Sequence, residues 1–566
     1  MFNKSAEITS TRLIFIGAPL TTLFLLISNV TDPVNATKLF IAGGLAFALF
    51  AVLIFFNFTA VSSQYKYFVS AVGLFVLTSI NSVLNSVSPI IQNLYGSYGR
   101  NTGLIAYLAL SFIALGALNL RKLENFRKII LGLQFAGMVN VIYCAWVLAF
   151  GDFIGWNNPY GNILGLFGNP DFISAFLGIF ITSLVAFAVA PSATIKYRLF
   201  SSGVSLITFY EIIRSHAIQG IVVTAGGLAI VGFFAIRSYF KKILFTSLYT
   251  FSVLGLGFLG ILGTLQKGPL SFVYKTSVSL RGAYWNAGIK MGTEHPFTGV
   301  GMDAFGDWYR RARSLKAATV LPGPKTFTNA SHNVVIDFFA YGGIPLLFSY
   351  LAILLIAGIA VIKVIHRSPN YEPVFVAMVA TWACYEVQSV ISINQVGLAI
   401  WGWLLTGALV AYENATRSEQ TSDAQELNKN MIRRKNIEQT SISPQLVSGI
   451  GLLIGLLIAV PPLAADMKWR AALKSQDAKI ALAALEPGYL NPSDSQRMAQ
   501  AAQLFESNNL TELAHQVTLK AIKFNPDYFD AWKILYFLSN ATQVEKYNAI
   551  KNMKRLDPLN PDVTAP

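Results

Sequence analysis

Arginine side chains beside the ends of long apolar segments suit the binding of a phosphate group. Arg100 precedes one apolar segment, and Arg214 closes another. Arg281 and Trp285 lie four residues apart in a polar stretch, so on a helix they share a face. A guanidinium group binds phosphate oxygens bidentately, and an aromatic ring beside it suits a sugar. We expect these residues to bind a phosphate attached to a sugar, although Arg100 alone also fits a side chain snorkelling at a membrane interface.

Histidine at the head of an apolar segment supplies a candidate for proton transfer. His332 stands at such a position, and Asn333, Asp337 and Tyr341 follow it at four-residue spacing, a polar stripe on an otherwise apolar helix. Imidazole exchanges a proton near neutral pH, so His332 is the candidate catalytic base, with Asn333 and Asp337 as substrate contacts. His216 is a second candidate of this kind. The alternative for either histidine is a structural helix cap.

Several other chemistries lack their motifs in this sequence. There is no nucleotide phosphate loop, no H-E-x-x-H and no cysteine cluster, and Cys144 and Cys384 lie inside apolar runs. We therefore expect no disulfide, no metal and no nucleotide cofactor. Glu386 lies deep in an apolar segment, where a carboxylate is either functional or hydrogen-bonded to another helix.

The elements that must position these side chains are membrane-spanning helices. The chain has 566 residues, of which 54% are hydrophobic and 13% charged, against about 25% charged in soluble domains. The fold expected is all-α and polytopic, with 12 to 13 transmembrane helices. The expected spans are 13–30, 39–57, 67–84, 103–119, 129–150, 172–190, 199–213, 217–236, 243–264, 333–362, 373–393, 396–412 and 446–463.

The formal charge of +15 is mostly a topology signal. With the N-terminus in the cytoplasm, inside segments carry nineteen Lys and Arg residues, including the basic linker 413–445, whereas short outside loops carry three. The long loop 265–332, between the ninth and tenth spans, is then outside. It holds nine basic and three acidic residues, a patch suited to a lipid diphosphate, so nucleic acid is not needed to explain the charge.

The region after the last span, 464–566, is expected to be an extracytoplasmic helical tail. Asn-Pro pairs recur at 491, 525 and 560, a spacing that resembles tetratricopeptide repeats. Such repeats bind partners along a concave face, so the tail is expected to dock a protein partner or the acceptor molecule. The alternative is a plain set of helical hairpins.

Taken together, residues 10–412 resemble the O-antigen ligase family, which includes O-antigen polymerases and protein O-oligosaccharyltransferases. The matching pieces are Asp32 to Lys38, Tyr98-Gly99-Arg100 with Gly103, Phe167-Gly168-Asn169-Pro170, Ser215 with Gln219-Gly220, Arg281, Trp285, Pro296, Gly299-Val300-Gly301, and Ser331-His332-Asn333 with Gly342-Gly343.

The resemblance implies a membrane glycosyltransferase that moves a glycan from a polyprenyl diphosphate to a lipid or protein acceptor, on the outer face of the bacterial inner membrane. It implies no metal or nucleotide. Carried over, Arg100 and Arg281 are diphosphate contacts, and His332 is the catalytic histidine. The family often has Ser-Arg where this chain has Ser215-His216, with Arg214 on the other side of the serine.

The sequence leaves the acceptor open, so a ligase, a polymerase and a protein O-oligosaccharyltransferase are all compatible with these residues. A transporter of polysaccharide or lipid is the rival from another class, and Glu386 fits it. A membrane scaffold acting through the tail is a third.

Overall fold

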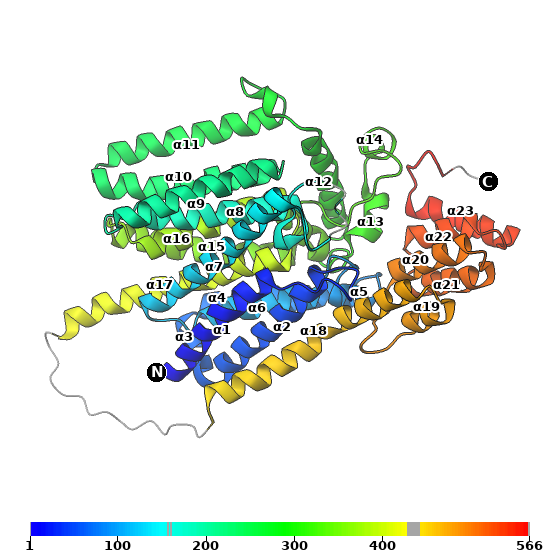
Figure 1. The fold of residues 1–566 in the computed structure, drawn as a ribbon, viewed down its shortest axis with the longest axis horizontal. Helices are drawn as coiled ribbons and strands as arrows, with labels where there is room; N and C mark the ends of the chain where they lie inside the picture. The colour runs from blue at the N-terminus through cyan, green and yellow to red at the C-terminus, as the bar shows by residue number, and fades with distance from the viewer. Residues whose placement is uncertain (1, 156–157, 159–160, 427–441, 564–566) are drawn as a thin grey trace.

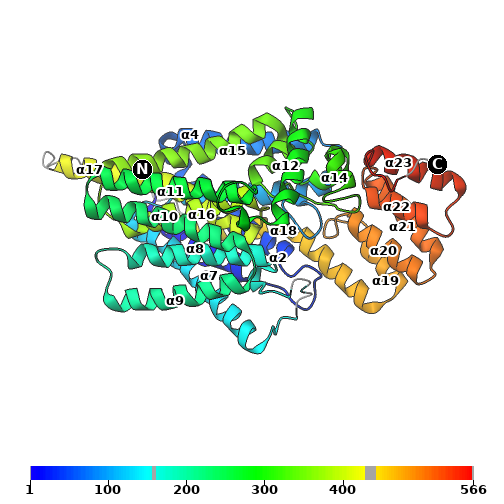
Figure 2. The ribbon, with the colours of Figure 1, turned by 90° about the horizontal axis from the view of Figure 1, so that it is seen from above.

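The structure is a computed structural model, and it describes residues 2–155, 158, 161–426 and 442–563. Over these residues the chain is all-helical, with one isolated bridge between Gly488 and Asn491 outside the helices. The membrane helices run side by side as a bundle, and the C-terminal helices gather beyond one end of it (Figures 1 and 2).

Ten of the described helical segments are long and apolar enough to cross a membrane, which confirms a polytopic all-α protein. The ten segments contain α2 (Asn35–Val52), continued by a π-helical turn (Leu53–Asn57) and α3 (Phe58–Gln64), then α4 (Lys66–Leu84), α7 (Leu123–Phe150), α8 (Pro170–Ala188), α10 (Ile218–Phe240), α11 (Ile243–Thr264), α15 (Val334–Arg367), α16 (Pro373–Ile391), α17 (Val396–Glu426) and α18 (Pro444–Ser475). The other three expected spans also fall on helices of the bundle, namely α1 (Lys4–Leu23), the shorter α6 (Leu104–Ala117) and α9 (Ile195–Arg214).

The first helix begins and ends earlier than the expected span 13–30. Asn3 caps α1, because its side chain accepts the backbone N–H groups of Ser5 and Ala6. Glu7, in the first turn of α1, is stabilised by a segment far away in the sequence, because its Oε1 atom accepts the backbone N–H of Arg121 at 2.9 Å. Residues 24–34 are apolar in part but not helical, so the hydropathy of 24–30 was misleading.

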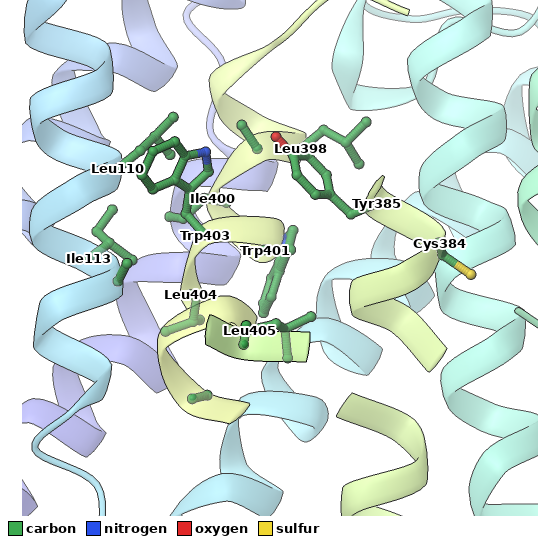
Figure 3. Close-up of a cluster of buried hydrophobic side chains, with 14 of the residues drawn as sticks. Leu110, Ile113, Cys384, Tyr385, Leu398, Ile400, Trp401, Trp403, Leu404 and Leu405 are labelled. Atoms are coloured by element: carbon green, nitrogen blue, oxygen red, sulfur yellow. The ribbon is translucent and has the colours of Figure 1, made fainter. Parts of the chain in front are cut away.

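The centre of the bundle is α17, whose membrane-crossing window is wholly buried among the other helices. Figure 3 shows its side chains Trp401 and Trp403 between α6 and α16. The Trp401 Nε1–H donates to Thr22 Oγ1 of α1 at 2.9 Å. On α16, Glu386 accepts from the Tyr350 hydroxyl of α15 at 3.4 Å. Among its two expected roles, this contact favours the hydrogen bond between helices.

The two ends of the bundle differ. The N-terminus, the end of α17 and the start of α18 lie at one end (Figure 1). The opposite end carries α5 (Ile90–Tyr95), a short 3-10 turn (Gly165–Phe167) before α8, another (Ser271–Val273), and the helices of the long loop, α12 (Thr276–Glu294), α13 (Phe305–Ala312) and α14 (Leu315–Thr319). The N-terminus and the long loop thus lie at opposite ends of the bundle, which agrees with an odd number of membrane crossings between them.

The linker and tail depart from the expected boundaries. Helix α17 continues to Glu426, so the linker 413–445 is helical at its start, and its residues 427–441 lie outside the described residues. Helix α18 runs past the expected end of the span, through Pro461 and Pro462, to Ser475. The tail then forms α19 (Ala478–Leu485), α20 (Ser495–Ser507), α21 (Thr511–Phe524), α22 (Phe529–Phe537) and α23 (Gln543–Leu556). Successive hairpins are seen, and a tetratricopeptide character remains a prediction.

The tail is fastened to the long loop by buried ion pairs. Arg313 Nη2 donates to both carboxylate oxygens of Asp557, at 2.9 and 2.7 Å, and both side chains are fully buried. Arg310 lies 3.3 Å from the same carboxylate, and Arg311 lies 3.1 Å from Asp527. The expectation that the basic loop forms one patch for a lipid diphosphate is therefore wrong for these three arginines, whose side chains pair with two carboxylates of the tail.

Candidate functional site

Arg100 lies on the loop between α5 and α6, and this loop is held by Asp303. The Asp303 Oδ2 atom accepts the backbone N–H of Ser97 at 2.8 Å and the Thr102 hydroxyl at 3.3 Å. The loop turns at Gly96, with a φ of +84°, where a Cβ would lie 2.5 Å from the same carboxylate oxygen. Glycine is thus required for the close approach that fixes Arg100.

Arg281 projects from α12 on the other side of the site. Its Nη2 atom lies 3.8 Å from the carboxylate of Asp171, which is in the first turn of α8. The N-cap of α8 is Asn169, whose side chain accepts the backbone N–H of Asp171 at 2.8 Å. Asn169 is therefore a structural cap, while Asp171 connects the helix to Arg281.

His332 is presented by an unusual backbone at the head of α15. Its φ of +61° lies in the left-handed region, which costs a non-glycine residue free energy that the surrounding contacts must offset. These contacts include the Ser331 N–H, which donates to Asp337 Oδ1 at 2.7 Å. The imidazole stacks on the Tyr284 ring, with 5.5 Å between centroids. The ring is therefore held between the loop and α12.

The charges of Arg100 and Arg281 both act on His332. Burial, and next the positive charges of the two arginines, lower the pKa of His332 to about 3. The imidazole is consequently neutral at physiological pH and, in the absence of a bound anion, a weak base. Burial raises the pKa of Asp303 to about 6, although the Ser97 N–H and the charge of Arg100 act in the opposite direction. Two cations thus lie near one neutral base.

The remaining expected site residues take other positions. Asn333 is buried and caps α15 by accepting the N–H groups of Val335 and Ile336, so its visible contacts are structural, as are those of Asp337. Arg214 is exposed at the end of α9, with its guanidinium 6.0 Å from the Tyr210 ring centre.

Two further expected residues, His216 and Trp285, lie next to α9 and on α12. His216 is exposed just after α9, with a left-handed φ of +58°. Trp285 lies on α12, and its indole N–H is buried without a hydrogen-bond partner in the described part of the chain. Such a donor is available to a bound ligand.

Sequence reasoning missed three residues of this site, Asp303, Asp171 as a partner of Arg281, and Tyr284. The available signal for Asp303 was charge, because it is one of only three acids in the basic segment 265–332. Within the described residues, no group of three or more His, Cys, Asp or Glu side chains is placed to hold a metal ion.

Fold and site together define a multi-pass membrane protein with a cationic, histidine-containing site at one end of its helix bundle. Residues 203–351 match the family model described as O-antigen ligase, and this range contains Arg281 and His332. The match supports the O-antigen ligase family for this part of the chain, in agreement with the resemblance seen in the sequence. No curated protein matches the chain.

Proposed function

We propose that the protein transfers a glycan from a polyprenyl diphosphate carrier to an acceptor hydroxyl, at the outer face of the bacterial inner membrane. One observation carries this proposal, namely that His332 stacks on Tyr284 of the helix that carries Arg281, where the charges of Arg281 and Arg100 both act on the imidazole. The match of residues 203–351 to the O-antigen ligase model supports a glycosyltransferase of this type.

The proposed chemistry needs two cations and one base. Arg100 and Arg281 bind the diphosphate through charge-assisted hydrogen bonds and stabilise its charge as it leaves. The bound anion offsets the positive charges that lower the pKa of His332, so the imidazole becomes a stronger base when the donor is present. Donor binding thereby prepares the base.

The reaction is a direct displacement. His332 accepts the proton of the acceptor hydroxyl, and the hydroxyl oxygen forms a bond to the anomeric carbon of the donor sugar. The bond from this carbon to the phosphate oxygen breaks, and its electron pair leaves with the diphosphate. Attack opposite the leaving group inverts the anomeric configuration. Removing a general base of this kind typically slows a reaction by 10²–10⁴-fold.

The experiment that tests the proposal uses the purified full chain, a polyprenyl diphosphate-linked glycan and separate lipid and protein acceptors. Appearance of glycosylated acceptor together with free polyprenyl diphosphate is the expected result. The acceptor that is used separates a ligase, a polymerase and a protein O-oligosaccharyltransferase. An intact donor after incubation with every acceptor class contradicts the proposal.

Orientation and location belong to the same proposal. The N-terminus is assigned to the cytoplasm and the tail to the outer face, because basic residues concentrate at the helix ends on the N-terminal side. The site then opens toward the outer face, where the carrier presents its glycan.

A further inference from the structure

A cavity of about 1120 Å³ lies between the tail and the outer end of the bundle. Arg100 and Asn169 line it from the bundle side, and Trp469 of α18 and Gln500 of α20 line it from the tail side. Its volume exceeds the ~300–1,000 Å³ usual for small-molecule sites, so it has room for a chain of several sugars.

The tail presents a row of amide side chains to this cavity. Gln496, Gln500 and Gln503 are spaced by four and three residues on α20, so they share one face of the helix, and all three line the cavity. The opposite side of α20, with Met498 and Ala502, is buried in the tail core. The row is therefore directed outward by the packing of the tail itself.

The position of this row relative to Arg100 is fixed by contacts on both sides. The Tyr98 hydroxyl, two residues before Arg100, donates to Asp466 of α18 at 2.5 Å. The Trp469 Nε1–H, one turn further along α18, donates to Gln500 Oε1 at 3.2 Å. A chain of contacts thus runs from the Arg100 loop through α18 to the amide row.

We propose that this cavity binds the glycan of the lipid-linked donor, an inference that rests on the proposed function. Amide side chains both donate and accept hydrogen bonds, which suits sugar hydroxyls. In the described part of the chain, Arg100 lines the cavity and His332 does not. The cavity is therefore on the diphosphate side of the site, and the acceptor approaches from the side of His332.

The test compares two lipids and two kinds of variant in the purified full chain. The lipids are the glycan-bearing polyprenyl diphosphate isolated from the source cells and the same carrier without sugar. The variant is the double substitution Gln500→Ala with Gln503→Ala, and the matched control is Gln516→Ala, an exposed glutamine on α21. Equal thermal unfolding of all proteins shows that the substitutions leave the fold intact.

The double variant is expected to bind the glycan-bearing lipid about tenfold more weakly, because each lost hydrogen bond contributes roughly 0.5–1.5 kcal/mol, and 1.4 kcal/mol is a factor of ten. Binding of the bare carrier is expected to be unchanged, and the control is expected to bind both lipids as the unsubstituted chain does. Equal binding of the glycan-bearing lipid by all proteins overturns the inference alone. Failure of the unsubstituted chain to bind either lipid overturns the proposed function as well.

Discussion

Asp303 holds Ser97 across more than two hundred residues of sequence, with its Oδ2 atom 2.8 Å from the Ser97 backbone nitrogen. The same carboxylate accepts from Thr102, so both ends of the short segment that carries Arg100 are fastened to one side chain. Asp303 is a positioning residue. Its contribution depends on its charge, because an ionised carboxylate accepts stronger hydrogen bonds.

The first prediction concerns the pH dependence of transfer. Asp303→Asn is expected to lower kcat/KM for the donor about tenfold at pH 8, where the native carboxylate is ionised. The pKa of Asp303 is about 6, so the native side chain takes up a proton as the pH falls below that value and comes to resemble the variant. The ratio of native to variant kcat/KM should fall toward one between pH 8 and pH 5. A ratio that stays constant over this range contradicts the positioning role.

The second prediction concerns Arg281. Arg281→Ala is expected to lower kcat/KM for the donor by about 10- to 100-fold, because hydrogen bonds to charged groups contribute about 1.5–3 kcal/mol. Arg281→Lys should recover part of the loss, since lysine keeps the charge but not the bidentate geometry. Lys290→Ala is the matched control on α12, exposed and 3.8 Å from Glu294. Steady-state transfer rates decide the matter, and equal rates for the Arg281→Ala and Lys290→Ala variants would exclude a diphosphate contact.

The third prediction concerns the attachment of the tail. Asp557→Ala leaves Arg313 buried without its carboxylate partner, and breaking a buried pair in this way typically costs about 3–5 kcal/mol. The variant is expected to show a lower thermal unfolding temperature. Proteolysis of the tail and of the long loop is expected to be faster, because the contact between them is weakened. Asp562→Ala, at an exposed position near the C-terminus, is the control. Unchanged stability in the Asp557 variant would show that the pair does not hold the tail.

The fourth prediction concerns membrane sidedness. In a chain whose two buried cysteines are left in place, Lys316→Cys on α14 should react with an impermeant thiol reagent from outside the membrane. Asn370→Cys, exposed between α15 and α16, should react only after the membrane is permeabilised. The reverse pattern would invert the proposed topology.

Hydropathy predicted the bundle well because burial in lipid demands long apolar helices. Every expected span falls on a helix of the bundle. The first expected span, 13–30, was placed too late in the chain, because the ends of α1 depend on contacts with distant residues that local hydropathy does not reveal. Glu7 is stabilised there by the backbone N–H groups of Arg121 and Lys122 and by the side-chain amide of Asn125.

Within the site, the spacing of residues predicted the parts but not their assembly. His332 was recognisable from its position before a polar stripe, whereas its contact with Tyr284 joins the head of α15 to α12, an earlier helix of the long loop. Arg313 pairs with Asp557, which lies 244 residues further along the chain. This pairing removes Arg313 from the patch that was expected to bind a lipid diphosphate. Net charge alone does not reveal which cations have partners within the chain.

The most direct test of the central claim is transfer of a labelled glycan by purified native protein and by a His332→Gly variant, with and without added imidazole. Glycine suits the left-handed backbone at this position, so the substitution removes the base with little strain. A loss of about 10²–10⁴-fold is expected for the variant, with partial recovery when imidazole is added. Transfer by the variant at the native rate would contradict the assignment of His332 as the base.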